Sequence, residues 1–141
     1  HWRGDPETMD RLTDYPGGVV AGVEAELRAR LAELDAAGVD RSQVVLDPGL
    51  GFAKTHAQSW ELLAATSRLI EDLRRPVLIG ASRKRFLALA AEAEATPVQR
   101  DAVTAATTAL AAAAGAWAVR VHEVPANRAA VRTASLWKEH Q

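Results

Sequence analysis

The chain has 141 residues and a formal net charge of −1, and 48% of its residues are hydrophobic. This balance is ordinary for a soluble globular protein with one modest core, and it gives no reason to expect nucleic acid or a membrane surface as a partner. The chain has no cysteine, which excludes disulfides and thiolate metal sites and fits the cytoplasm, where we expect the protein. It has no run of about 18 apolar residues that would predict a membrane span, and its N-terminus has no signal-peptide pattern.

Helical and extended patterns alternate along the chain. In order, they predict a loop over residues 1–17, a helix over 19–37, a strand over 44–47, a helix over 56–74, a strand over 77–82, a helix over 85–93, an Ala-rich helix over 97–114, a strand over 116–124 and a last helix over 126–137. Strands that alternate with helices pair in parallel, so the pattern predicts an α/β fold whose sheet is covered by helices.

Three parallel strands alone would leave two exposed edges, which is an aggregation hazard. A complete (β/α)₈ barrel typically has about 250 residues, roughly twice the length of this chain. We therefore predict that residues 1–141 form one unit, the C-terminal half of a (β/α)₈ TIM barrel, with the N-terminal half removed or not included. The conspicuous polar residues Asp47, Ser82 and His122 all fall at the carboxyl ends of strands, the edge where parallel α/β folds bind ligands.

Asp47 ends the first strand and is followed at once by the Pro48-Gly49 turn. A carboxylate at the end of a buried strand is costly unless it has a partner. It either caps its own turn or binds a ligand, and the cations at the ends of the two later strands favour a ligand. The loop that follows is not a P-loop, because Ala53 stands where that motif needs glycine.

Two basic clusters accompany the later strands. Ser82, Arg83, Lys84 and Arg85 lie between a strand and a helix start, where an anionic ligand or a solvated basic patch would explain them. Arg120 and His122 are two residues apart and therefore share one face of their strand. They either pair with carboxylates as structural residues or, with the basic turn, form a pocket for phosphate or pyrophosphate. His1 and Trp2 look like the end of a preceding strand on the same rim.

Four segments in the right order and spacing resemble dihydropteroate synthase, the folate-pathway enzyme that sulfonamides inhibit. They are His1-Trp2-Arg3-Gly4 with the nearby Pro6 and Thr8-Met9, then residues 47–55, then residues 80–84, then residues 120–124. The resemblance implies the condensation of 6-hydroxymethyl-7,8-dihydropterin diphosphate with 4-aminobenzoate, with release of pyrophosphate.

The resemblance also implies roles for individual residues. Asp47 would bind the amino-pyrimidine edge of the pterin, and Lys84 would hydrogen-bond the pterin from the side. Arg120 would lie over the pterin ring and hold the diphosphate together with His122. Lys84, Arg120 and His122 would thus be the catalytic residues, while Phe52 and Arg83 would bind the ring and the carboxylate of 4-aminobenzoate.

The family implies further features that these residues do not supply. A magnesium ion is expected, but its asparagine ligand belongs to the missing first half, so we expect no metal ligand in this chain. A homodimer is also implied. The helix over residues 97–114 is a plausible dimer contact and an equally plausible packing surface within the barrel. Two residues depart from the family pattern: Ala53 often is glycine, and Arg85 often is a small hydroxyl residue.

Two other functions remain open. A corrinoid methyltransferase that binds methyltetrahydrofolate would share a residue like Asp47. It needs no diphosphate pocket, whereas Arg120 and His122 indicate one, so these residues argue against this alternative. A non-catalytic pterin-binding paralogue is the second alternative, and the intact strand-end motifs argue against it. Without the first half of the barrel, we expect the chain by itself to be inactive or nearly so.

Overall fold

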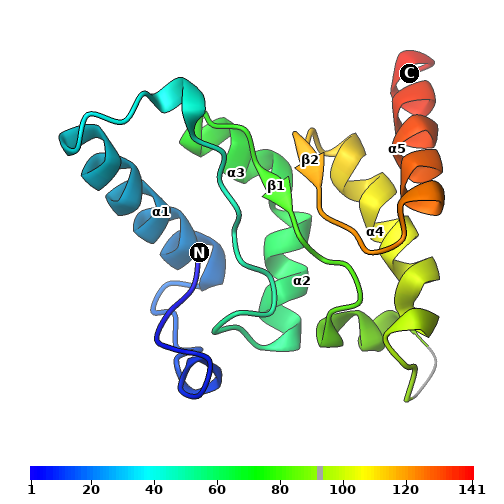
Figure 1. Cartoon of the computed structure of the whole chain (residues 1–141), viewed down its shortest axis with the longest axis horizontal. Helices are drawn as coiled ribbons and strands as arrows, with labels where there is room; N and C mark the ends of the chain where they lie inside the picture. Colours follow the sequence, from blue (N-terminus) through cyan, green and yellow to red (C-terminus); the bar gives the residue numbers. More distant parts are fainter. Residues whose placement is uncertain (92–93) are drawn as a thin grey trace.

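The computed structural model describes residues 1–91 and 94–141, in which helices outnumber short parallel strands (Figure 1). The regular elements are α1 (Val19–Ala36), α2 (His56–Ala64), α3 (Thr66–Leu73), β1 (Leu78–Ile79), α4 (Asp101–Ala113), β2 (Ala118–Val119) and α5 (Val124–Glu139). Short 3₁₀ turns occupy Met9–Arg11, Arg41–Gln43, Arg85–Ala90 and Val98–Arg100. The helix expected over residues 85–93 is therefore a 3₁₀ turn in its described part, and its positions 92–93 lie outside the described residues.

The three predicted strands lie side by side and run parallel, but they are shorter than expected. Leu78 and Ile79 of β1 pair with Ala118 and Val119 of β2. On the other edge of β1, the segment expected as the first strand makes only a single parallel bridge, Leu46 to Val77. The ladder stops there because its next hydrogen bond would need an amide proton at residue 48, which is a proline.

The end of the last predicted strand also differs from expectation. Residues 120–123 are not strand, and α5 begins at Val124 rather than beyond Pro125. Proline is compatible with the first turn of a helix, where its missing N–H has no partner to lose. The Glu123 side chain accepts a hydrogen bond from the Ala126 amide (2.9 Å) and so caps the helix.

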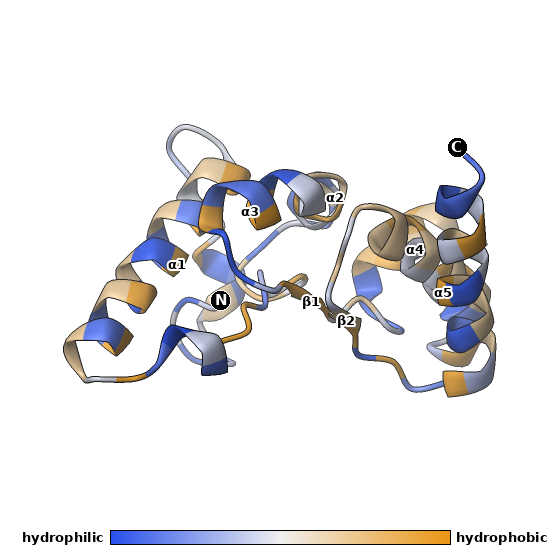
Figure 2. Cartoon of the chain, turned by 90° about the horizontal axis from the view of Figure 1, so that it is seen from above, coloured by the Kyte–Doolittle hydropathy of each residue, from blue (hydrophilic) through white to orange (hydrophobic). Residues whose placement is uncertain are grey.

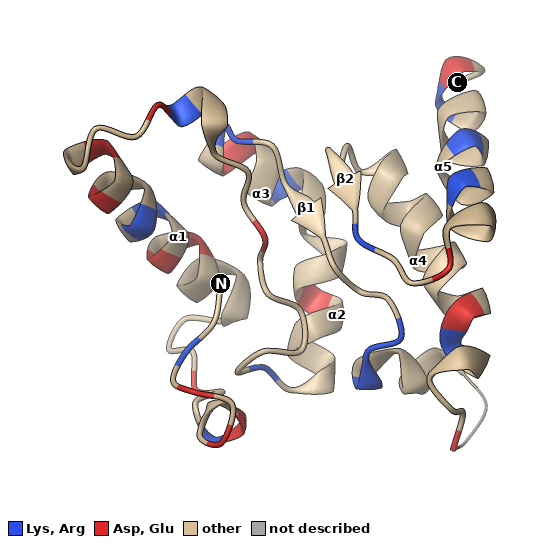
Figure 3. Ribbon diagram, in the orientation of Figure 1, with Lys and Arg blue, Asp and Glu red and all other residues tan. Residues whose placement is uncertain are grey.

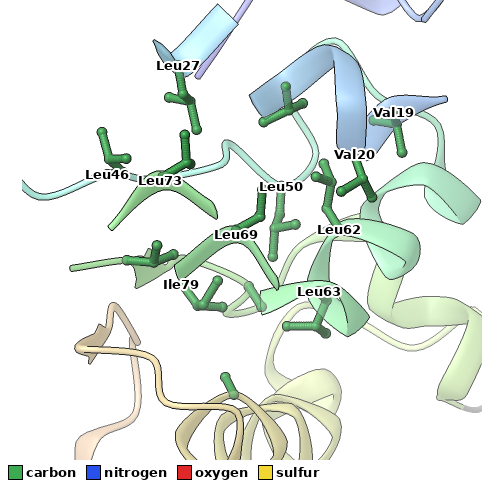
Figure 4. Close-up of a cluster of buried hydrophobic side chains, with 14 of the residues drawn as sticks. Val19, Val20, Leu27, Leu46, Leu50, Leu62, Leu63, Leu69, Leu73 and Ile79 are labelled. Atoms are coloured by element: carbon green, nitrogen blue, oxygen red, sulfur yellow. The ribbon is translucent and has the colours of Figure 1, made fainter. Parts of the chain in front are cut away.

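The helices lie along one side of the strands (Figure 2). In a complete barrel the helices cover the outer side of the strands in the same way. Leu46, Val77 and Ile79 are buried against this helical layer, as the close-up of the core shows for Leu46 and Ile79 (Figure 4). Each fully buried aliphatic side chain of this size contributes about 2 kcal/mol to the free energy of unfolding. Because side chains alternate along a strand, Val45 and Leu78 point to the opposite face, where Val45 is exposed.

The helix expected over residues 56–74 is divided at Ala65 into α2 and α3. The buried Thr66 hydroxyl donates to the Leu63 carbonyl (2.7 Å), a local bond that competes with the regular helical pattern. Thr55 begins α2 with a capping box, since its hydroxyl and the Gln58 side chain each bond to the other residue's amide. The capping box fixes the α2 N-terminus directly after the loop that carries Phe52.

The Ala-rich helix α4 packs against α5 at one end of the molecule (Figure 1). Its buried face carries Thr104, Thr107, Thr108 and Ala111. The Thr108 hydroxyl donates to Asn127 Oδ1 of α5 (2.6 Å), so the small side chains serve close packing within the barrel wall. A dimer through this helix stays a prediction. Among the residues that the structure describes, no helix is long and apolar enough to cross a membrane.

Candidate active site

Asp47 and Arg120 approach the same point at the carboxyl ends of the strands. A Cβ atom on Gly80 would lie 3.1 Å from Nη2 of Arg120 and 3.6 Å from Oδ2 of Asp47. The glycine thus leaves open the space where the carboxylate and the guanidinium converge. The Arg120 amide donates to the Ile79 carbonyl (3.0 Å), which fixes the start of the segment that follows β2. Basic segments follow the ends of both strands on this side of the molecule (Figure 3).

Asp47 caps its own turn and still offers an oxygen to a ligand. Its Oδ1 accepts a hydrogen bond from the Gly49 amide (2.8 Å), so Asp47 does cap its own turn, as one of the two interpretations predicts. In the part of the chain that the structure describes, its Oδ2 accepts no protein hydrogen bond and faces Gly80. The two interpretations of this residue are therefore compatible, because each uses a different oxygen.

The segment after Asp47 lies next to the N-terminal residue. The main-chain nitrogen of His1 donates to the Asp47 carbonyl (2.6 Å). A side chain on Gly49 would overlap the His1 carbonyl, and Gly49 has a φ of 70°, so only glycine fits this turn. His1 therefore lies beside the end of the first predicted strand, although residues 1–2 form no strand in the structure.

Lys84 is held between Leu50 and Phe52. Its ammonium donates to the Leu50 carbonyl and lies 4.3 Å from the centroid of the Phe52 ring, within the range of a cation–π contact. Burial lowers the pKa of Lys84 to about 8, although the nearby Asp47 carboxylate opposes this shift. Lys84 is thus a partly desolvated cation next to the carboxylate that would bind a ligand.

Ser82 connects the ends of β1 and β2. Its hydroxyl oxygen lies 2.9 Å from Nδ1 of His122 and accepts the His122 amide (3.1 Å). Ser82 is buried, whereas the side chains of Arg120 and His122 are exposed. Within the described residues, neither Arg120 nor His122 forms an ion pair with a carboxylate, so the structural interpretation of this pair is not supported.

Arg83 has an internal partner that the sequence did not reveal. Its guanidinium donates two parallel hydrogen bonds to the Asp101 carboxylate at the start of α4 (2.8 Å each). The Arg83 hydrogen bond lowers the pKa of Asp101. The Arg85 guanidinium, by contrast, is largely exposed, 3.7 Å from Oδ2 of Asp10. Asp101 thus balances part of the charge of the basic turn, and the anionic ligand expected there stays a prediction.

Two neighbouring cavities share Phe52 as a wall. The first, of about 480 Å³, is lined by Asp47, Gly49 and Phe52 together with the segment from His1 to Met9. The second, of about 530 Å³, is lined by Phe52, Lys54 and the basic turn over residues 83–85, with Asp10 among its walls. The structure therefore brings Asp47 to one cavity, Arg83 and Lys84 to the other, and Phe52 to both.

The interpretation of the sequence gave no individual role to Gly80 or Lys54 and did not predict the contact that Ser82 makes. Gly80 opens the segment over residues 80–84, but its role depends on which side chains converge on it. Lys54 is buried although it lies in a glycine-rich loop, and Ser82 holds His122 through a tertiary contact. Among residues 1–91 and 94–141, no group of three or more His, Asp and Glu side chains could hold a metal ion.

The structure is thus a partial parallel α/β barrel with a carboxylate and cations at its strand ends. A family model described as "Pterin binding enzyme" matches residues 1–122, and the chain belongs to this family. Within it, the similar curated proteins are dihydropteroate synthases. Those of Mycobacterium leprae and Staphylococcus haemolyticus are 45% and 34% identical over 97% and 99% of this chain, which spans 49% and 58% of their own lengths.

Solved structures of dihydropteroate synthases have the same fold. The Yersinia pestis enzyme with a sulfonamide drug matches 100% of this chain at 28% identity, with a TM-score of 0.90 and 50% of its own length covered. The Thermus thermophilus enzyme in complex with 6HMPPP matches 96% of this chain at 37% identity, with a TM-score of 0.87 and 53% of its own length covered. The Xanthomonas albilineans enzyme with 4-aminobenzoic acid matches 100% of this chain at 37% identity, with a TM-score of 0.83 and 47% of its own length covered. The predicted half of a barrel is confirmed, and the chain spans about half the length of the relatives it matches.

Proposed function

We propose that this chain is the C-terminal half of a dihydropteroate synthase, which condenses 6-hydroxymethyl-7,8-dihydropterin diphosphate with 4-aminobenzoate and releases pyrophosphate. The observation that carries the proposal is the convergence of Asp47 and Arg120 across Gly80, next to Lys84, in a chain of the pterin-binding family. A carboxylate for the heterocycle and cations for the diphosphate are the groups that this substrate needs.

The pterin would bind at the free side of Asp47. Its amino group and ring N–H can donate two parallel hydrogen bonds to a carboxylate, as a guanidinium does. Oδ2 is open, and Oδ1 keeps a second lone pair beside the bond from Gly49. Lys84 would donate to the pterin from the side, because its ammonium is already held at the same edge by the Leu50 carbonyl.

The diphosphate would lie between Arg120 and His122. The amino nitrogen of 4-aminobenzoate donates its lone pair to the pterin methylene carbon, and the new C–N bond replaces the C–O bond. The electrons of that C–O bond leave with pyrophosphate, and the nitrogen loses its proton to water. Negative charge grows on the leaving group, so preorganised cations stabilise the transition state more than the ground state. Ser82 would hold the His122 ring toward the diphosphate.

We propose that the complete synthase also uses a magnesium ion. When bound, the ion would neutralise diphosphate charge. The described residues offer no cluster of carboxylates and imidazoles for it, so its protein ligand would come from the other half of the barrel.

The 4-aminobenzoate ring would pack on Phe52, and its carboxylate would lie in the basic cavity. The two hydrogen bonds from Arg83 to Asp101 mean that Arg83 can contribute only one remaining edge of its guanidinium. Arg85 lines the same cavity with a largely exposed guanidinium and would share the carboxylate. Sulfonamides would compete at this position, and we extend to this chain the cytoplasmic location and the homodimer expected for the family.

Titration of inorganic pyrophosphate into the purified chain tests this function. We expect saturable binding that is lost in Arg120→Ala and in His122→Ala, and retained in the control Arg132→Ala, which removes an exposed arginine from α5. Equal binding by all four proteins would contradict the proposal and favour a pterin protein without a diphosphate pocket, such as a corrinoid methyltransferase.

We further propose that the chain alone is catalytically inactive or nearly so. Half a barrel leaves Arg120 and His122 exposed to water, which weakens electrostatic stabilisation of the transition state. Dihydropteroate formation by the purified chain at the rate of a full-length synthase would overturn this expectation.

A further inference from the structure

Lys54 is a buried lysine for which the proposed reaction has no use. It is only 6% exposed, although a lysine buried without partners is strongly disfavoured. Its ammonium donates to the Phe52 carbonyl (2.9 Å) and lies 3.0 Å from Nδ1 of His1. Burial lowers the pKa of Lys54 to about 8, in keeping with a cation kept in place at a cost. We expect a buried lysine with these contacts to hold neighbouring residues in position.

The groups around Lys54 fix its position from several elements. From α1, Glu26 accepts a hydrogen bond from Arg3 Nε (2.9 Å) and pairs with His1 Nε2 (2.9 Å). The Arg3 guanidinium lies 3.8 Å from the Tyr15 ring centroid, and Lys84 and Asp47 face Lys54 from the active-site side. Glu26 thus binds one guanidinium and the His1 imidazole, and the other ring nitrogen of His1 contacts the Lys54 ammonium, so the ammonium is ordered by a packed network.

The loop that Lys54 holds is in an unfavourable backbone conformation. Ala53 has a φ of 50°, a left-handed conformation that costs a residue with a side chain about 1 kcal/mol. Ala53 is completely buried, and its carbonyl accepts the Tyr15 hydroxyl (3.0 Å). The carbonyls of Phe52 and Ala53 are therefore held by buried side chains, while the Phe52 ring stands outside, 39% exposed.

We infer that Lys54 is a positioning residue for Phe52. By binding the Phe52 carbonyl from the buried side, it keeps the ring at the wall between the two cavities and against the Lys84 ammonium. Without this hydrogen bond, the strained turn at Ala53 relaxes, and the ring moves away from Lys84. The consequence for 4-aminobenzoate rests on the proposed function, whereas the consequence for the contact between Phe52 and Lys84 does not.

Proton NMR of the unliganded chain tests the inference directly. Because the Lys84 ammonium lies over the Phe52 ring, we expect the ring current to shift the ε-CH₂ protons of Lys84 upfield, and Phe52→Leu gives the value without that ring. We expect Lys54→Met to lose the upfield shift, with Lys84 moving to the value seen in Phe52→Leu. Lys54→Arg, which keeps a donor, should recover part of it. Lys138→Met makes the same change on an exposed residue of α5 and should leave Lys84 unchanged.

A second pair of measurements separates positioning from general loss of structure. Lys54→Met should retain pyrophosphate binding, which depends on Arg120 and His122, while its affinity for 4-aminobenzoate falls. Should Lys54→Met fail to fold, nuclear Overhauser contacts in the unaltered chain decide. Contacts from the Lys54 ε-CH₂ to the His1 ring and to the backbone at Phe52 support the inference. Their absence, or an unchanged Lys84 shift in a folded Lys54→Met protein, overturns it.

Discussion

The Asp47 carboxylate and the Arg120 guanidinium face one another across Gly80, which has no side chain to separate them. They come from segments at opposite edges of β1, and strand alternation places them on the face turned away from the helices. A carboxylate and a guanidinium left this close in a protein are usually a salt bridge. Among the described residues they form no ion pair with each other, and under the proposed function each of them binds a different part of the substrate.

Gly80→Ala should reduce pyrophosphate binding without unfolding the chain. The added methyl group would meet Nη2 of Arg120 at 3.1 Å, and the exposed guanidinium can swing away. We expect a change in the free energy of unfolding of no more than about 1 kcal/mol, because Gly80 does not have a positive φ. Calorimetric titration checks the affinity. Since both changes act through one guanidinium, Gly80→Ala combined with Arg120→Ala should be no worse than Arg120→Ala alone.

Ser82→Ala should weaken pyrophosphate binding by roughly fivefold, which corresponds to about 1 kcal/mol for one lost hydrogen bond. The change frees both the ring nitrogen and the amide of His122 from their partner. Ser135→Ala, an exposed serine of α5, is the matched control and should bind pyrophosphate like the unaltered chain. Equal affinities for both variants would show that His122 needs no support from Ser82.

Arg83→Ala should lower the free energy of unfolding near neutral pH, by an amount that disappears in acid, whereas Arg85→Ala should not. Arg83 lowers the pKa of Asp101 in the folded state, so the pair stabilises the fold above the unfolded-state pKa of an aspartate, about 3.9. This contribution is lost as the pH falls through the lower, folded-state pKa. Urea unfolding at several pH values is the measurement. A stability profile for Arg83→Ala parallel to that of the unaltered chain would contradict the prediction.

The buried lysines should make the chain more stable as the pH rises from about 8 to about 10. The pKa of Lys84 in the folded state is about 8, below the value of about 10.4 for an unfolded chain. Between these two values the unfolded state binds more protons, so the free energy of unfolding increases with pH. Lys84→Met should remove about 1 kcal/mol of this rise after allowance for solvent screening. Urea midpoints across this range would show the difference in slope.

The sequence was most informative where side-chain alternation decides the outcome. Leu46, Val77 and Ile79 face the helices, while Asp47 and Arg120 face the other way, as their spacing in apolar strands requires. The limits of α1 and the position of α5 could also be predicted, because apolar periodicity and a terminal glycine or proline mark them.

Contacts between distant turns could not be predicted from the sequence. The pairing of Arg83 with Asp101 depends on how a strand end meets the start of α4, and no local pattern records this. The burial of Lys54 could not be predicted either, because it depends on contacts with His1 and with the network around Glu26, which lie far away in the sequence. The break at Ala65 depends on one buried hydroxyl, that of Thr66, within an otherwise continuous helical pattern.

Titration of 6-hydroxymethyl-7,8-dihydropterin diphosphate into the purified chain tests the central claim most directly. Asp47→Asn keeps an oxygen that can cap the turn at Gly49 and replaces the open Oδ2 acceptor by an uncharged NH₂ donor, so it separates ligand binding from folding. We predict saturable binding that is lost in Asp47→Asn and in Arg120→Ala and retained in Arg132→Ala. Binding of equal strength in all of these proteins would contradict the assignment of Asp47 to the pterin and of Arg120 to the diphosphate.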